Sequence, residues 1–76
     1  MISYSPESDA VYILLSGHKV GHTRVIDDLR ILDYDDDWNV VGLELLGASD
    51  GLDLRGLPEH DWLIEAAKVL IFPVLV

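Results

Sequence analysis

The 76-residue sequence predicts a small α+β fold, an antiparallel β-meander of about five strands with one C-terminal helix packed on one face. Two observations predict this class. Runs rich in β-branched and aromatic residues alternate with short polar turns through residue 46. A single stretch with helical spacing of apolar residues then follows near the end of the chain. This order of strands before a helix is typical of a two-layer α+β unit.

Five strands are expected, at residues 1–5, 10–15, 20–26, 29–34 and 40–46. Residues 6–9 favour a turn between the first two, because proline presets one backbone dihedral while serine and aspartate bond their own backbone. Residues 10–15 are apolar on both faces, which is typical of a strand that is covered on both sides. Residues 20–26 alternate loosely and predict a more exposed strand. The last two runs predict a hairpin around residues 35–39.

A loop, a helix and an apolar tail are expected after the strands. Residues 47–57 are rich in glycine and predict a loop with one short extended piece at 52–54. Pro58 suits the first position of a helix at 58–70, in which Glu59 and Asp61 complement the helix dipole. The helix carries one apolar stripe, which consists of Trp62, Leu63, Ala66, Ala67 and Leu70. Pro73 interrupts the apolar tail at 71–76. Residues 1–76 as a whole are expected to form a single domain.

The predicted core combines one face of the sheet with the stripe of the helix. Its members are Val11, Ile13, Leu15, Val41, Leu43, Leu45, Leu63, Ala66 and Leu70. Trp62 is expected to fill the core as well, because tryptophan is usually well buried.

The charge balance excludes several classes of partner. Fourteen acidic residues face five basic ones, which gives a formal net charge of −9. Nucleic acids and anionic membranes are bound by clustered lysine and arginine, so neither is an expected partner. The sequence shows no secretory signal and no apolar run long enough to cross a membrane, and we expect a cytoplasmic location. There is no cysteine, which excludes disulfides and thiolate zinc sites.

The acidic residues between 33 and 44 imitate a calcium loop. The residues Asp33, Asp35, Asp37, Asn39 and Glu44 occupy positions 1, 3, 5, 7 and 12 of a twelve-residue EF-hand loop. Position six needs glycine for a sharp turn but holds Trp38, and the residues after it are strand-like rather than helical. We therefore interpret these acids as a solvated hairpin turn, with Glu44 on a sheet face, and predict no metal site.

The other candidate sites also lack support. His18 and His22 would lie about 13 Å apart along a strand, too far to share one ion. Ser16 has no nucleophile motif around it. The pair Asp27 and Asp28 lies in a turn, where desolvation cannot tune a pKa for acid–base work. We predict no catalytic, cofactor-binding or metal-binding residue and no cofactor.

Self-association is expected from the surplus of apolar surface. A chain of this size without disulfides or a metal lacks the usual means of stabilising a small core. One short helix covers one face of residues 10–15, so the second face, with Tyr12 and Leu14, remains to be hidden. The apolar tail at 71–76 should not be left in water either, so it either adds an edge strand or docks on another subunit. We expect a homodimer or larger oligomer.

The first two thirds of the sequence resemble a small bacterial family catalogued as domain of unknown function 2283. The segment YSPESDAVYI at residues 4–13 matches an opening that runs roughly YDPEADALYI in that family. The similarity continues through TRVIDD at 23–28, ILDYD at 31–35 and VVGLEL at 40–45. It covers about residues 2–49, although the family often has glycine where this chain has Trp38 and Asn39.

The resemblance implies a compact β-meander with a helix in the cytoplasm of a bacterium, and it supplies no activity and no catalytic residues. Family members are often encoded beside small toxin-like proteins, which implies an antitoxin-like role with a small protein partner encoded nearby. Two hypotheses follow. The first is a non-enzymatic protein-interaction module. The alternative is a small enzyme or ligand-binding subunit whose pocket forms between protomers, using Asp33 and Glu44.

Overall fold

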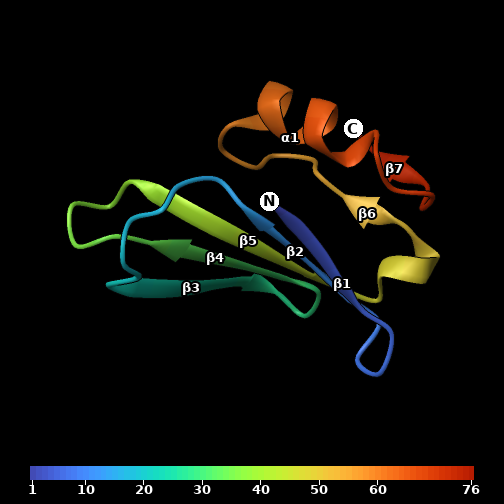
Figure 1. Cartoon of the computed structure of the whole chain (residues 1–76), viewed down its shortest axis with the longest axis horizontal. Helices are drawn as coiled ribbons and strands as arrows, with labels where there is room; N and C mark the ends of the chain where they lie inside the picture. The colour runs from blue at the N-terminus through green and yellow to red at the C-terminus, as the bar shows by residue number, and fades with distance from the viewer.

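The computed structural model describes residues 1–76, which form two layers (Figure 1). One layer is a five-stranded sheet of β1 (Ile2–Ser5), β2 (Ala10–Leu14), β3 (His22–Asp27), β4 (Arg30–Tyr34) and β5 (Val40–Leu46). The second layer holds the 3-10 turn η1 (Ala48–Asp50), the strand β6 (Leu52–Asp53), the helix α1 (His60–Ala67) and the strand β7 (Val74–Leu75). The α+β class, the five antiparallel strands and the single C-terminal helix are confirmed.

The order of strands across the sheet is β1-β2-β5-β4-β3. Each neighbouring pair is antiparallel. Residues 15–21 carry the chain from β2 to the far edge, so β3, β4 and β5 return as a meander that ends beside β2 (Figure 1). The two most apolar strands, β2 and β5, therefore pair at the centre of the sheet.

The hydrophobic core lies between one face of the sheet and the second layer. Six of the predicted core residues are buried: Val11, Ile13, Val41, Leu43, Leu45 and Leu63. The other three, Leu15, Ala66 and Leu70, are half-buried and pack against this core. The core also includes six residues beyond the predicted set, namely Leu32, Ala48, Leu52, Leu54, Leu57 and Ala67.

The helix is shorter than predicted, and one of its residues was placed wrongly. Helix α1 begins at His60 rather than residue 58, because Glu59 adopts a left-handed backbone with φ 57°. Trp62 is 45% exposed, so the prediction that it fills the core is wrong. Leu63 and Ala67, one helical turn apart, are the helix residues that are buried against the sheet. Trp62 precedes Leu63 by about 100° around the helix axis and lies at the border of this contact.

The glycine-rich segment and the apolar tail are joined in the structure. The short extended piece predicted at 52–54 appears as β6, and the tail contributes β7, which pairs with it in parallel. The backbone N–H of Leu52 donates to the carbonyl of Pro73 at 2.8 Å, and that of Leu54 donates to Leu75 at 2.9 Å. Neither helical element is long and apolar enough to cross a membrane.

Candidate functional site

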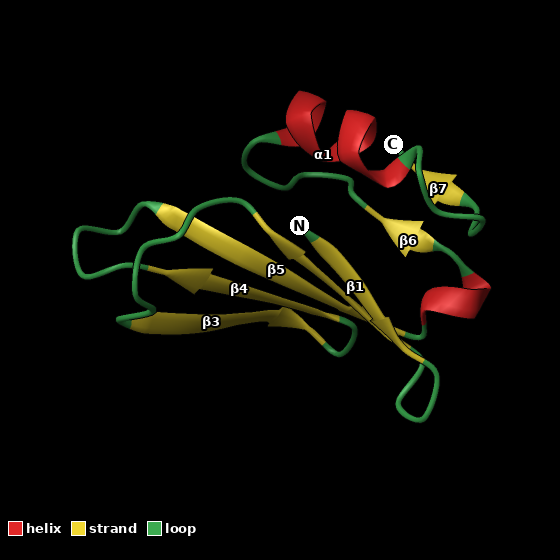
Figure 2. Ribbon diagram, viewed as in Figure 1, coloured by secondary structure: helices red, strands yellow, loops and turns green.

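The sheet face turned away from helix α1 has no cover within the chain. Figure 2 shows α1, β6 and β7 on one side of the five strands, with nothing on the other side. Side chains on this uncovered side alternate with the core residues along each strand. We call it the open face, and its main residues are Tyr12, Leu14, Thr23, Val25, Ile31, Asp33, Glu44 and Leu46.

One row of paired residues crosses the middle of the open face. Tyr12 of β2 pairs with Glu44 of β5, which pairs with Ile31 of β4, and Ile31 pairs with Val25 of β3. Tyr12, Glu44 and Ile31 are half-buried, and Val25 is 67% exposed. The Glu44 carboxylate therefore lies in the central strand, with the aromatic side chain of Tyr12 on one side and the aliphatic side chain of Ile31 on the other.

A hydrogen-bonded group fixes the orientation of Tyr12. Its hydroxyl donates to Asp33 Oδ2 at 2.7 Å, and the hydroxyl of Thr23 donates to Asp33 Oδ1 at 2.8 Å. The Tyr12 ring reaches Asp33 by lying across Gly42, where a Cβ atom would overlap the phenol oxygen. Burial raises the pKa of Tyr12 to about 12, helped by the Asp33 hydrogen bond and by the charges of Asp33 and Glu44. The phenol therefore stays neutral and remains a donor at physiological pH.

Glu44 has no partner in the chain. It forms none of the side-chain hydrogen bonds on the open face and none of the ion pairs of the molecule. Three of the five basic side chains are engaged elsewhere, in the ion pairs Arg30–Asp27, Arg55–Asp53 and Lys68–Glu65. Asp33 and Glu44, on which the alternative hypothesis rests, thus share the open face, but only Glu44 is free to accept a new donor at both oxygens.

The calcium-like residues are not brought together. Asp33 and Glu44 face outward from the sheet, while Asp35 turns into the β4–β5 loop. No group of three or more histidine, aspartate or glutamate side chains is arranged to hold a metal ion.

The prediction of a wholly solvated acidic turn is wrong for Asp35, which is only 7% exposed. Its carboxylate accepts hydrogen bonds from the backbone amides of Asp37 and Asn39, both at 2.9 Å, and lies 3.0 Å from His18 Nδ1. The His18 contact and these amides hold the pKa of Asp35 far below its usual range. Asp35 therefore organises the turn instead of solvating it.

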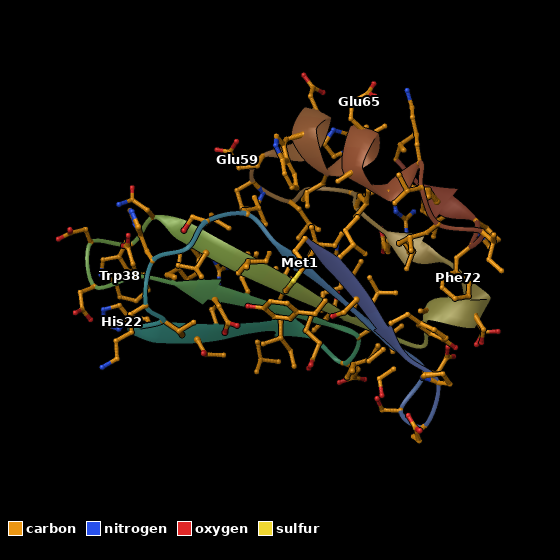
Figure 3. The ribbon with its side chains drawn as sticks, in the orientation of Figure 1. Met1, His22, Trp38, Glu59, Glu65 and Phe72 are labelled. Carbon is orange, nitrogen blue, oxygen red and sulfur yellow. The ribbon has the colours of Figure 1, made fainter.

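The two histidines play separate parts at this end of the sheet. His18 contacts Asp35, whereas the His22 ring stacks on Trp38 with centroids 3.9 Å apart and planes 2° apart. Figure 3 shows His22 beside Trp38 at the end of the molecule opposite Phe72. Trp38 itself has a left-handed backbone, with φ 63°. These rings stabilise the β4–β5 turn.

Two hollows mark the surface away from the open face. One, of about 240 Å³, is lined by Leu15, Asn39, Val40, Glu59 and Trp62. The other, of about 280 Å³, is lined by Asp27, Asp28, Leu29, Arg30 and Asp53. In the second, the carboxylate of Asp27 is engaged by Arg30 at 2.8 Å. Ser16 lines neither hollow, and its hydroxyl accepts the backbone N–H of His18 at 3.3 Å.

A second apolar surface lies at the C-terminal end of the chain. The exposed side chains of Val69, Ile71, Leu75 and Val76 form what we call the C-terminal strip. Ile71 is the most exposed, at 94%. Between them, Phe72 turns inward and packs on the ring of Tyr4 with centroids 4.9 Å apart.

Comparison with known proteins finds one family that matches the part of the chain containing the sheet. The family model described as Protein of unknown function (DUF2283) matches residues 1–49, which is the segment from β1 to η1. No curated protein and no solved structure matches the chain. The resemblance noted in the sequence is therefore confirmed over the strands that build the open face, and the chain belongs to the DUF2283 family.

Proposed function

We propose that the chain is a non-enzymatic protein-interaction module that assembles as a homodimer through the C-terminal strip. The observation that carries this proposal is the amount of apolar surface left uncovered in a single chain. Val69, Ile71 and Val76 are all more than 60% exposed. Several exposed apolar side chains so close together in the sequence favour a contact surface, because large apolar patches on soluble proteins mark interaction sites.

Charge favours the C-terminal strip over the open face as the contact between two copies. Each copy carries a net charge of −9, so most surfaces of two copies repel one another. Residues 69–76 contain no charged side chain, and two strips can meet without opposing acidic side chains. The strand β7 also has one edge that does not pair with β6, and such an edge is available for main-chain pairing with a second copy.

Light scattering at micromolar concentration tests the dimer. We expect a mass of twice 8.5 kDa for the native chain, and a mass near 8.5 kDa for Ile71→Glu. This substitution suits the test because Ile71 is almost fully exposed, so it leaves the core intact, whereas deletion of 71–76 removes β7. Val25→Glu, on the open face, is the matched control and should stay dimeric. A native chain of 8.5 kDa would contradict self-association. Dissociation by Val25→Glu alone would contradict the choice of surface.

More specifically, we propose an antitoxin-like role in the cytoplasm of a bacterium, with a small protein partner encoded nearby. The gene neighbours that the family resemblance implies and the acidic composition of the chain support it, since an acidic chain is suited to binding a basic protein. The test is co-expression of the chain with the product of the neighbouring gene, followed by purification through the chain alone. A stoichiometric complex is the expected result, and recovery of the chain without that product would contradict this role.

A further inference from the structure

We propose that the open face docks a protein segment that presents one lysine or arginine to Glu44 and packs apolar side chains on either side of it. The proposal names the partner class for the interaction module and rests on that proposed function. It uses a different surface from the C-terminal strip, so the two proposals can fail separately.

Glu44 selects the charge of the partner. Its carboxylate lies in the central strand, between Tyr12 and Ile31, and forms no hydrogen bond or ion pair within the chain. A partner that covered this face with apolar atoms alone would strip water from an unpaired charge, which is strongly unfavourable. A lysine or arginine at the same place replaces that water with charge-assisted hydrogen bonds.

The surroundings of Glu44 are already arranged for packing. The ring of Tyr12 is held across Gly42 by its 2.7 Å hydrogen bond to Asp33, so it offers a flat surface without further ordering. Leu14, Ile31 and Leu46 are half-buried beside it, outside the hydrophobic core. Apolar side chains flanking the partner's basic residue would contact these groups.

Asp33 is less available to a cation than Glu44. Both of its oxygens already accept hydroxyl groups, from Tyr12 and Thr23. Glu44 is therefore the carboxylate of this face with both oxygens free, and its apolar neighbours favour a basic residue flanked by apolar side chains over a polybasic segment.

A second copy of this chain does not fit the open face. Face-to-face packing of two copies would place Asp33 and Glu44 of each copy against an equally acidic surface. The bases outside the intrachain pairs with aspartate and glutamate are Lys19 and Arg24. Arg24 pairs with the core residue Leu32, on the face of β3 opposite to Thr23 and Val25, and it cannot reach Glu44 of a copy stacked on the open face. Charge complementarity thus favours a different protein that presents a basic residue to Glu44.

Selection from a displayed library of random short peptides tests the proposal. We expect the native chain to enrich peptides in which a lysine or arginine is flanked by apolar residues. A selected peptide should bind Glu44→Gln about tenfold more weakly or worse, because one partner of a desolvated ion pair has been removed. Glu65→Gln is the matched control: it makes the same change in net charge on helix α1, in the other layer, and should leave affinity unchanged. Selection on Glu44→Lys should enrich acidic residues instead.

The position of the bound peptide is a second readout. Backbone amide shifts in an NMR titration should move along the row of Tyr12, Glu44, Ile31 and Val25, and stay constant in α1. Three results would each overturn the proposal: no peptide of micromolar affinity, equal weakening by Glu44→Gln and Glu65→Gln, or shifts confined to the second layer. A monomeric native chain that still binds such peptides would refute the dimer alone.

Discussion

Substituting Gly42 with alanine should destabilise the protein through Tyr12 and not through the backbone. An alanine Cβ at this position would overlap the phenol oxygen of Tyr12 and lie 2.5 Å from its Cζ. No backbone atom is among the nearest atoms that it would meet. The ring of Tyr12 must therefore swing off β5, and its hydrogen bond to Asp33 is lost.

The size of the effect follows from three contributions. A hydrogen bond to a charged acceptor contributes about 1.5–3 kcal/mol, and water replaces part of it here because both groups are half-buried, which leaves a loss of about 1–2 kcal/mol. Uncovering roughly 40 Å² of apolar surface as the ring moves adds about 1 kcal/mol. Alanine offsets about 0.4–1 kcal/mol of this, because it restricts the unfolded chain more than glycine does. We expect a net loss of about 1–2.6 kcal/mol.

Urea unfolding followed by tryptophan fluorescence measures this change, at one fixed protein concentration so that association does not vary. The decisive comparison repeats Gly42→Ala in a Tyr12→Ala background. There the overlap is gone, and the same substitution should stabilise the fold by about 0.4–1 kcal/mol. An equal loss in both backgrounds would refute the reasoning, because it would place the strain in the strand itself.

Three further predictions follow from the turn and the acidic residues. The pKa values of Asp9 and Asp35 are lowered by their hydrogen bonds from the ordinary 3.8, so the unfolded chain binds protons more readily than the folded one. The urea midpoint should therefore be level above about pH 5 and fall as the solution is acidified further, and Asp35→Asn should reduce that fall. Trp38→Gly relieves a left-handed backbone but loses the stack on His22, so the free energy of unfolding should change by less than about 1 kcal/mol. Trp38→Ala loses the same stack without relieving the backbone, and should be about 1 kcal/mol less stable than Trp38→Gly. Calorimetry should find no calcium or zinc binding tighter than about millimolar, and a micromolar calcium isotherm abolished by Glu44→Gln would contradict this.

The sequence predicted the strands best where the residue types and the length of an apolar run both indicated a strand. Residues 10–14 and 40–46 combine β-branched residues with strand length, and both appear as strands with their alternate residues in the core. The prediction that Glu44 lies on a sheet face is confirmed. The absence of an ion pair with Glu44 could not be predicted from the sequence, because it depends on where all five basic side chains lie in space.

From residue 52 onward, the sequence pattern was compatible with more than one choice of core residues. The glycine-rich segment predicts a loop with one short extended piece at 52–54 and no core residues, yet Leu52, Leu54 and Leu57 all enter the core. Because they fill that space, the helix needs to bury only Leu63 and Ala67, and Trp62 is left at the edge. Tertiary packing thus overrode the preference of tryptophan for the interior.

The burial of Asp35 has a different cause. Acids in a turn are usually solvated, but here the backbone wraps around one carboxylate and supplies two amide donors. Such local side-chain-to-backbone bonding is common for aspartate, and several aspartates in succession hide which of them takes the role.

The division of the core between two layers has a consequence for synthesis on the ribosome. The sheet is complete at Leu46, and the leucines and the helix that cover it are all encoded later, from Leu52 onward. While only the first fifty residues have been made, the apolar face with Val11, Leu43 and Leu45 has nothing to pack against. The apolar face of the nascent sheet therefore stays exposed until residues 52–76 have been synthesised. During this interval the chain is most prone to aggregate or to bind a chaperone.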